Sequence, residues 1–407
     1  MIARKRDGGT LDDEAIGALI QGFSSGDVPD YQIAAFAMAV FFQGMDERET
    51  AALTRAMRES GRVFQWPDDR PPVVDKHSTG GIGDKVSLVL APLLACDGLW
   101  VPMVSGRGLG ITGGTLDKME SIPGFRVALG IEEAQDQVRR MGLAMMGQTA
   151  DFCPADRKFY ALRDVTGTVP SIPLITASIM SKKLAESLDR LVLDVKYGTG
   201  AFMRTREDAE ALAESMRRVA AGFDLSFHTV LTPMSEPLGC AVGNALEMIE
   251  ALECLEGGGP PDLEALVLDL AEPIANSPRE TLQGYLRDGS AAAKWRQLVE
   301  TQGGDLAIMG KLAEHHRAPV VRDVLVEEQG GGTLAALDAG AVGQAALELG
   351  AGRARAEDDV DPRVGFDRLA KTGTTMQSGD LLARVHAATE EAASRAATAL
   401  QSAVRWE

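Results

Sequence analysis

The chain carries the stretch DKHSTGGIGDK from Asp75 to Lys85 and, after an apolar run, the stretch SGRGLGITGGTLDKME from Ser105 to Glu120. Nine glycines fall between Lys76 and Glu120, where 44 glycines in 407 residues would give about five and an average protein about three. Glycine lacks a Cβ atom, so its backbone N–H groups can approach a ligand closely. Two such loops, surrounded by hydroxyl and lysine side chains, predict a cradle for a phosphate-sized anion.

Two well-known phosphate motifs do not describe these loops. Neither loop has the Gly-x-x-x-x-Gly-Lys-Ser/Thr spacing of a P-loop. The second loop does contain Gly108-x-Gly110-x-x-Gly113, which is the spacing of a dinucleotide-binding turn. However, Ser-Gly-Arg precedes that spacing and Thr-x-Asp-Lys follows it, and Gly-Gly pairs alone are often plain turns. The residues therefore favour an anion-binding loop of another kind.

The second stretch resembles the signature of thymidine and pyrimidine-nucleoside phosphorylases, Ser-Gly-Arg-Gly/Ala-Leu-x-x-Thr-Gly-Gly-Thr-x-Asp-Lys-x-Glu, at every fixed position. The stretch from Lys76 to Gly81 resembles the first phosphate loop of the same family. The likeness runs from Arg4 near the N-terminus to Phe366 near the C-terminus. It implies a helical domain, a larger α/β domain, and a substrate cleft between them.

The resemblance also implies the reaction, which is reversible phosphorolysis of thymidine, and of deoxyuridine, to the free base and 2-deoxy-α-D-ribose 1-phosphate. Inorganic phosphate is then a co-substrate, with no cofactor and no metal. Taken singly, Arg163 and Lys182 would be interpreted as surface charges, so their roles rest on the resemblance. It assigns phosphate binding to Lys76, Ser78, Gly80, Gly81, Ser87, Ser105 and Thr115, pyrimidine binding to Thr79, Leu109, Tyr160, Arg163, Ser178 and Lys182, and catalysis to His77, Arg163 and Lys182.

His77 is the candidate acid, because an unperturbed histidine titrates near the working pH. It would protonate or hydrogen-bond the O2 atom of the leaving base. Its alternative role is that of a neutral hydrogen-bonding residue of the loop. Holding both reactants in line would supply about 7–11 kcal/mol, and Arg163 and Lys182 would stabilise charge developing on the base.

Three further positions bear on substrate and ion preference within the family. Met103 stands where broad-specificity members tend to carry lysine, which favours deoxyribonucleosides. Lys85 and Glu250 stand where some members bind potassium, and we expect the Lys85 ammonium to replace the ion and pair with Glu250. Ile111 departs from the histidine that is common at its position.

Other functions stay open at this stage. One is a broad pyrimidine-nucleoside phosphorylase that also accepts uridine. Another is an enzyme like anthranilate phosphoribosyltransferase, which uses a pyrophosphorylated sugar and magnesium; the intact Thr115-x-Asp117-Lys118 motif argues against it. A third is a non-catalytic nucleoside- or anion-binding protein, which the joint presence of Arg163, Ser178 and Lys182 disfavours.

Composition limits the partners. A formal charge of −18 argues against nucleic acid, and no apolar run approaches the roughly 20 residues of a membrane span. The start from Met1 to Asp7 lacks the apolar core of a signal peptide. The four cysteines show no Cys-x-x-Cys spacing, which predicts free thiols and a cytoplasmic protein. The five histidines show no zinc-ligand spacing, so we expect no structural metal. The resemblance implies a homodimer formed through the helical domain.

The hydrophobic pattern predicts an α/β fold with a small all-helical domain, a larger α/β domain with a mainly parallel sheet, and a C-terminal α+β section packed on it. Residues 1–66 and 155–188 are assigned to the helical, pyrimidine-binding and dimerising domain, 72–154 and 189–335 to the phosphate-binding domain, and 336–407 to the C-terminal section. A capping box at Thr10 and Asp13 should begin the first long helix. Further helices are predicted over 86–96, 132–141, 208–221, 238–256, 262–271 and 390–404. Strands are predicted over 73–74, 99–104, 143–146, 191–195 and 230–231. We expect a hinge at 67–72, and strands and turns over 340–352.

Overall fold

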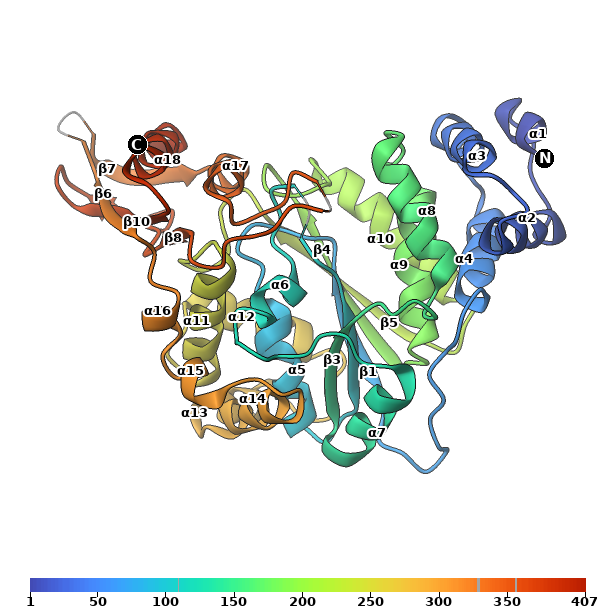
Figure 1. The fold of residues 1–407 in the computed structure, drawn as a ribbon, viewed down its shortest axis with the longest axis horizontal. Coiled ribbons are helices and arrows are strands. Elements are labelled where there is room, and N and C mark those ends of the chain that lie inside the picture. The colour runs from blue at the N-terminus through green and yellow to red at the C-terminus, as the bar shows by residue number, and fades with distance from the viewer. Residues whose placement is uncertain (109, 328–329, 356) are drawn as a thin grey trace.

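The computed structural model describes residues 1–108, 110–327, 330–355 and 357–407. It has three parts, which lie in a row in Figure 1: a group of helices at the right, a parallel sheet with its covering helices at the centre, and a C-terminal section at the left. The predicted fold class is confirmed. The described helices include none long and apolar enough to cross a bilayer.

The helical part forms around one apolar core. Its first long helix is capped by Asp12, whose side chain accepts from Ala15 N at 2.8 Å, so the predicted cap at Thr10 was wrong by two residues. The ring of Phe159 packs between those of Phe23 and Phe36, with centroids 6.2 and 6.4 Å away, which joins a later helix to the N-terminal ones. The helices of this part are α1 (Ile2–Arg6), α2 (Asp13–Ser25), α3 (Asp30–Gln43), α4 (Glu47–Glu59), α8 (Pro154–Val165) and α9 (Ile172–Ala185).

Helix α9 belongs to two cores. Leu174 and Ala177 pack with the helical part, whereas Met180 and Leu184 pack against the sheet. The helix ends at Ala185, and Ser187 takes a positive φ of 54°. Leu188 reaches the same core from the turn after the helix.

The sheet at the centre is parallel, as predicted. Its strands lie in the order β3-β2-β1-β4-β5, because a parallel bridge between Val73 and Trp100 joins the pair β2–β3 to the trio β1–β4–β5. All five carboxyl ends therefore meet at one edge, where ligands bind in such sheets. The strands are β1 (Val74–Ser78), β2 (Val101–Ser105), β3 (Leu143–Gly147), β4 (Arg190–Tyr197) and β5 (Ser226–Pro233).

Helices cover both faces of this sheet (Figure 1). Helices α5 and α12 pack on one face and α7, α9 and α10 on the other. The run 86–96 is apolar on all sides, and it forms α5 as predicted, buried between the sheet and an outer layer of helices. The helices of this part are α5 (Val86–Cys96), α6 (Thr115–Met119), α7 (Ile131–Met141), α10 (Arg206–Ala220), α11 (Asn244–Leu255), α12 (Pro261–Ala271), α13 (Arg279–Arg287), α14 (Ser290–Thr301), α15 (Leu306–Met309) and α16 (Leu312–His315).

The predicted helix over 238–256 begins six residues late. Gly239 and Gly243 have φ values of 69° and 132°, which a helix does not accommodate, and α11 starts only at Asn244. The preceding segment is irregular, so its carbonyl groups are free to bind side chains.

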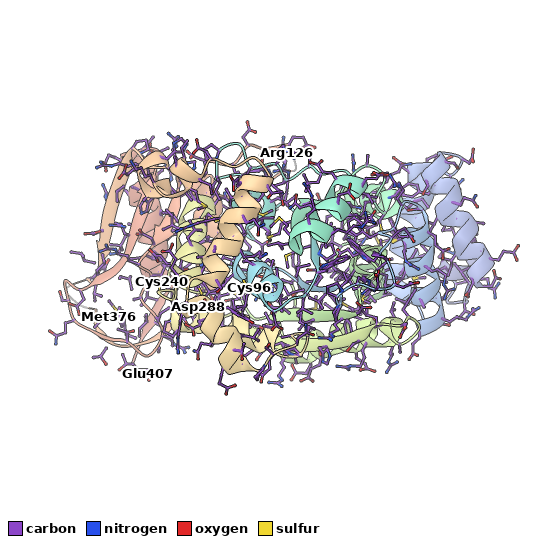
Figure 2. The ribbon with its side chains drawn as sticks, turned by 90° about the horizontal axis from the view of Figure 1, so that it is seen from below. Cys96, Arg126, Cys240, Asp288, Met376 and Glu407 are labelled. Carbon is purple, nitrogen blue, oxygen red and sulfur yellow. The ribbon has the colours of Figure 1, made fainter. Side chains whose placement is uncertain are left out.

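The described residues of the C-terminal section form two small antiparallel sheets and two helices. Figure 2 shows Met376 and Glu407 at its outer end. The prediction of strands and turns over 340–352 was wrong, because Asp338 caps a helix by accepting from Ala341 N at 2.7 Å and Val342 and Leu349 are buried at helical spacing. The elements are β6 (Val320–Leu325), β7 (Gly332–Leu337), α17 (Ala339–Leu349), β8 (Gly365–Asp367), β9 (Thr375–Met376), β10 (Leu381–Ala387), α18 (Glu390–Ser402) and β11 (Val404–Trp406).

The chain passes between the helical part and the sheet three times, at 60–73, 148–153 and 186–189. The first pass contacts the second, with Arg62 N donating to Asp151 O at 2.7 Å. It also contacts the third, with Ser187 Oγ donating to Phe64 O at 2.8 Å. A Cβ atom on Gly61 would lie 2.3 Å from Asp151 O, so the first two passes touch. The three passes run side by side.

Candidate active site

Strand β1 contributes three consecutive side chains that line the cavity, Lys76, His77 and Ser78. Successive residues of a strand point to opposite faces of the sheet. Lys76 and Ser78 accordingly face the first glycine loop, while the Asp75 carboxylate on the other face pairs with Lys183 of α9. The predicted strand at 73–74 is therefore longer than expected, and it carries the first part of the loop motif itself.

The first glycine loop is held closed by its own side chains. Ser78 Oγ donates to Asp84 Oδ2 at 2.6 Å and accepts from Gly80 N at 3.1 Å. Thr79 Oγ1 accepts from Lys196 N at 2.9 Å, which ties the loop to strand β4. Lys76 Nζ lies 3.4 Å from Ser87 Oγ at the start of α5.

A cluster of buried charges lies beneath this loop. Lys196 Nζ lies 2.7 Å from Asp194 Oδ2 and 3.7 Å from Asp84 Oδ2, and Lys76 Nζ lies 3.8 Å from Asp84 Oδ1. Burial alone would raise the pKa of Asp84, but the charges of Lys196, Lys76 and Lys118 outweigh it and hold the pKa below its usual value. Asp84 is thus ionised, and its charge is matched by lysines, so an arriving anion meets no uncompensated carboxylate.

The second glycine loop follows β2 and ends at α6, with Ser105 at the end of the strand and Thr115 at the start of the helix. Its turn is tight, because a Cβ atom on Gly114 would lie 2.0 Å from Gly108 N. Asp117 Oδ2 accepts from Gly108 N at 2.7 Å. The first of these contacts shows why glycine is needed at position 114.

The helical part supplies the other wall. Asp156, Tyr160 and Arg163 recur at i, i+4 and i+7 on α8, so they lie on one face of the helix. Arg163 is 1% exposed and donates to the backbone carbonyls of residues 168, 169 and 174. Burial lowers its pKa to about 10, so the guanidinium stays charged at neutral pH.

Lys182 reaches the same wall from α9. Its Nζ atom donates to Ser178 O at 2.7 Å, to Ser178 Oγ at 3.1 Å and to Asp156 Oδ2 at 2.5 Å. Two of the predicted pyrimidine-binding residues, Ser178 and Lys182, therefore contact each other. Asp156 was missed, although its spacing from Tyr160 and Arg163 on one helix was a usable signal.

The two walls enclose one cavity of about 830 Å³. It is lined by most of the predicted residues: Lys76, His77, Ser78, Thr79, Gly80, Ser87, Ser105, Thr115, Tyr160, Arg163, Ser178 and Lys182. Leu109 lies outside the described residues. Gly81 does not line the cavity in the described part of the chain; a Cβ atom there would lie 2.5 Å from Lys196 Cδ, so close packing accounts for this glycine.

His77 has an altered proton affinity. Burial, and after it the charges of Lys183, Lys182 and Lys76, lower its pKa well below the usual value. The imidazole is therefore neutral at pH 7. As a proton carrier it must therefore receive its proton during the reaction and does not hold one beforehand.

Phe202 is a further cavity residue that the sequence analysis missed. It follows strand β4 and is 52% exposed, an unusual position for a large aromatic side chain. The sequence predicts a strand over 191–195, and an aromatic residue soon after the end of that strand was the available signal.

Three family models match separate parts of the chain. The model described as "Glycosyl transferase family, a/b domain" covers residues 70–285, and the helical bundle domain of the same family covers 1–61. The model described as "Pyrimidine nucleoside phosphorylase C-terminal domain" covers 333–407. The chain belongs to the thymidine and pyrimidine-nucleoside phosphorylase family.

Relatives in this family match nearly end to end. The thymidine phosphorylase of Mesorhizobium japonicum is 47% identical, across 99% of this chain and 94% of its own length. The pyrimidine-nucleoside phosphorylase of Staphylococcus haemolyticus is 45% identical, across 95% and 91%. A solved structure, the anthranilate phosphoribosyltransferase of Thermus thermophilus, superposes with a TM-score of 0.58 over 74% of this chain and 98% of its own. At 19% identity it shows the fold alone.

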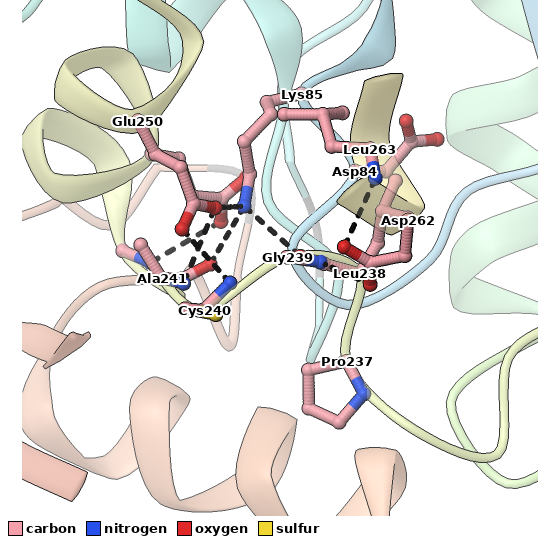
Figure 3. Close-up of polar contacts among 12 residues, drawn as sticks. Asp84, Lys85, Pro237, Leu238, Gly239, Cys240, Ala241, Glu250, Asp262 and Leu263 are labelled. Carbon is pink, nitrogen blue, oxygen red and sulfur yellow. Dashed lines mark hydrogen bonds and ion pairs between the residues drawn. The ribbon is translucent and has the colours of Figure 1, made fainter. Parts of the chain in front are cut away.

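The Lys85 ammonium is surrounded by oxygen atoms of Leu238, Ala241 and Glu250 (Figure 3). It donates to Leu238 O at 3.0 Å and Ala241 O at 2.9 Å and forms an ion pair with Glu250. Lys85 is 1% exposed. The predicted pairing of Lys85 with Glu250 is therefore present, and it ties the first glycine loop to the irregular segment before α11.

Met103 does not contact the cleft directly. It is fully buried in the core of the sheet and is not among the described residues that line the cavity. Ile111, in contrast, does line the cavity. The preference for deoxyribonucleosides that was inferred from Met103 stays a prediction.

Proposed function

We propose that this protein catalyses the reversible phosphorolysis of thymidine, and of deoxyuridine, to the free pyrimidine and 2-deoxy-α-D-ribose 1-phosphate. One observation carries the proposal: an anion cradle on the sheet and an arginine–serine–lysine wall on the helices line the same cavity. The names of the relatives, thymidine phosphorylase and pyrimidine-nucleoside phosphorylase, support the substrate class.

Phosphate binds on the sheet side. Lys76 supplies the cation, and the hydroxyl groups of Ser78, Ser87, Ser105 and Thr115 supply hydrogen bonds. Both loops are fixed by internal contacts before phosphate arrives, so little ordering remains to be done on binding. The cleft thereby holds the attacking oxygen in place, which lowers the barrier through proximity.

The pyrimidine binds on the helix side. Arg163, Ser178 and Lys182 face the carbonyl oxygens of the base, and the ring of Tyr160 lies against the base. The Lys182 side chain is 19% exposed, and its contact with Asp156 fixes its position. Cations placed in advance at the oxygens where charge develops stabilise the departing base anion.

Protons balance without an added acid. A phosphate oxygen forms the new bond to C1′ while the bond from C1′ to the base breaks and its electron pair leaves with the base. Hydrogenphosphate thereby loses the proton that the base anion needs. A neutral His77 can accept this proton and deliver it to the base, and its lowered pKa makes the delivery easy.

The test is an assay with thymidine and phosphate in the presence of a chelator, followed by the absorbance change for free thymine. We expect turnover in the wild type and a loss of about 10²-fold or more in the variant Lys182→Met. Lys158→Met is the matched control, because that lysine on α8 is half-exposed and pairs with Asp30 outside the cavity. Turnover of a pyrophosphorylated sugar with magnesium, and none of thymidine, would favour the phosphoribosyltransferase alternative.

Several properties extend this proposal. No cofactor or metal is required. Among the described residues no group of three His, Cys, Asp or Glu side chains could hold a metal ion, but the prediction itself stays untested. The Lys85 ammonium takes the place of potassium, so activity should be equal in potassium and sodium buffers. Whether uridine is also accepted is decided by assaying it beside thymidine. The predicted cytoplasmic location stays a prediction.

The protein forms a homodimer through its helical part. Helix α3 supports this, because it leaves large apolar side chains uncovered: Tyr31 is 73% exposed and Phe42 75%. Met38 and Phe41 beside them are each 36% exposed. Sedimentation analysis of Phe42→Asp against the wild type is the test, with a monomeric variant as the expected result.

A further inference from the structure

The C-terminal section packs directly behind the loops that form the anion cradle. A Cβ atom on Gly343 of α17 would lie 2.4 Å from Ile82 Cδ1 in the first loop. One on Gly352 would lie 2.8 Å from Gly110 O in the second loop. Each contact allows only glycine without displacement, so this section packs closely against both loops, although none of its described residues lines the cavity.

Arg353 makes the most specific of these contacts. Its Nη1 atom lies 2.8 Å from Asp117 Oδ1, and its backbone carbonyl accepts from Gly110 N at 2.8 Å. Its Nε atom donates to Asp358 O at 2.8 Å, which fixes the side chain in place. Arg353 is 8% exposed, so little water reaches its guanidinium group.

Asp117 links this contact to the second loop. It is 4% exposed, and its other oxygen, Oδ2, accepts from Gly108 N. Its second cation, Arg107, has a side chain that is 46% exposed and shared with Glu120. A half-exposed arginine compensates a buried carboxylate weakly, because solvent screens it. Arg353, whose side chain is 10% exposed, therefore supplies Asp117 with a cation that solvent screens much less.

We propose that Arg353 is a positioning residue for phosphate binding. Through Asp117 and Gly110 it holds the second loop in the shape that aims Ser105 and Thr115 into the cleft. The C-terminal section thereby completes the anion site without touching the substrate. The kinetic part of this proposal rests on the proposed function, whereas the loop-ordering part does not.

The first experiment measures hydrogen exchange by mass spectrometry on the whole protein. In Arg353→Met we expect the peptide with the Gly108 and Gly110 amides to exchange about tenfold faster. The peptide of the first loop around Gly80 should stay unchanged. The control Arg355→Met, with an exposed side chain two residues along, should resemble the wild type. Unchanged exchange at Gly108 and Gly110, or faster exchange throughout the molecule, would overturn the proposal.

The second experiment is kinetic. Arg353→Met should raise the KM for phosphate about tenfold or more, and Arg353→Lys should recover part of the loss because a cation returns to Asp117. The double variant with Asp117→Asn should be no worse than the poorer single variant, since both act on one contact. Additive losses, or an unchanged phosphate KM, would refute the positioning role. A wild type inactive on thymidine would refute the proposed function and leave the exchange result standing.

Discussion

Replacing Lys85 by methionine would remove one partner of a fully buried ion pair while keeping a side chain of similar length. Glu250 would then be left charged in the core, with the carbonyls of Leu238 and Ala241 also deprived of their donor. Breaking a buried pair from one side costs about 3–5 kcal/mol, because the remaining charge is uncompensated. We therefore expect Lys85→Met to lower the free energy of unfolding by that amount.

Lys371 offers a matched control on the same segment. Its Nζ atom donates to Pro237 O at 2.6 Å and Gly239 O at 3.2 Å and pairs with Asp262 at 2.9 Å, yet its side chain is 27% exposed. Partly solvated ion pairs contribute about 0–1 kcal/mol. Lys371→Met should therefore cost far less than Lys85→Met, although both lysines bind the carbonyls of adjacent residues.

Urea unfolding followed by circular dichroism measures both variants. Adding Glu250→Gln to Lys85→Met should restore much of the lost stability, because the amide keeps an acceptor for Cys240 N and removes the charge. The reasoning is refuted if Lys85→Met unfolds as easily as Lys371→Met, or if the double variant is less stable than Lys85→Met.

Four other outcomes are expected. Gly114→Ala should abolish turnover in the thymine assay, since its Cβ atom would meet the backbone of the second loop. Gly17→Ala in α2 is the control: its Cβ atom would have open space, and thermal melting should show a stabilisation of about 0.5–1 kcal/mol. His77→Ala should lower kcat by about 10²-fold, and a change within twofold would remove its proton-carrying role. Because folding lowers the pKa of His77, the folded state binds fewer protons than the unfolded state. The free energy of unfolding should therefore fall as the pH drops below 6.5, and it should fall less in His77→Gln. Urea titrations at each pH measure this. Lys182→Met should also cost about 3–5 kcal/mol by leaving Asp156 unpaired; Asp156→Asn in the same chain should restore stability but not activity.

Sequence patterns located the elements wherever local residues decide them. The apolar run 86–96 forms one helix with the predicted bounds, since every face of it is buried. The errors lie where tertiary contacts override a local signal. The small residues over 340–352 suggested turns, but the structure has a helix there. Gly343 lies in that helix, and it is small because Ile82 packs against it. The late start of α11 reflects the positive φ of Gly243, a conformation that no periodicity reveals.

The candidate site was predicted from two motifs and one resemblance, and nearly all of its described residues line one cavity. What the motifs could not supply is the support around them. Asp156 was missed because its role depends on Lys182 of another helix, and Arg353 because it lies more than 200 residues from the loop it contacts. Met103 lies next to the second motif in sequence, yet its side chain is buried in the core and does not reach the site.

The three passes between the helices and the sheet have a consequence for how the halves of the cleft can separate. The segments 60–73, 148–153 and 186–189 run side by side and share hydrogen bonds, which sliding or twisting would break. We therefore expect any opening of the cleft to be a swing of one half about these segments. Cutting the peptide backbone at one pass would leave two covalent tethers intact. A protease that nicks the exposed bend at Asp68 and Asp69 should therefore yield two fragments on a denaturing gel from a molecule that still migrates as one under native conditions.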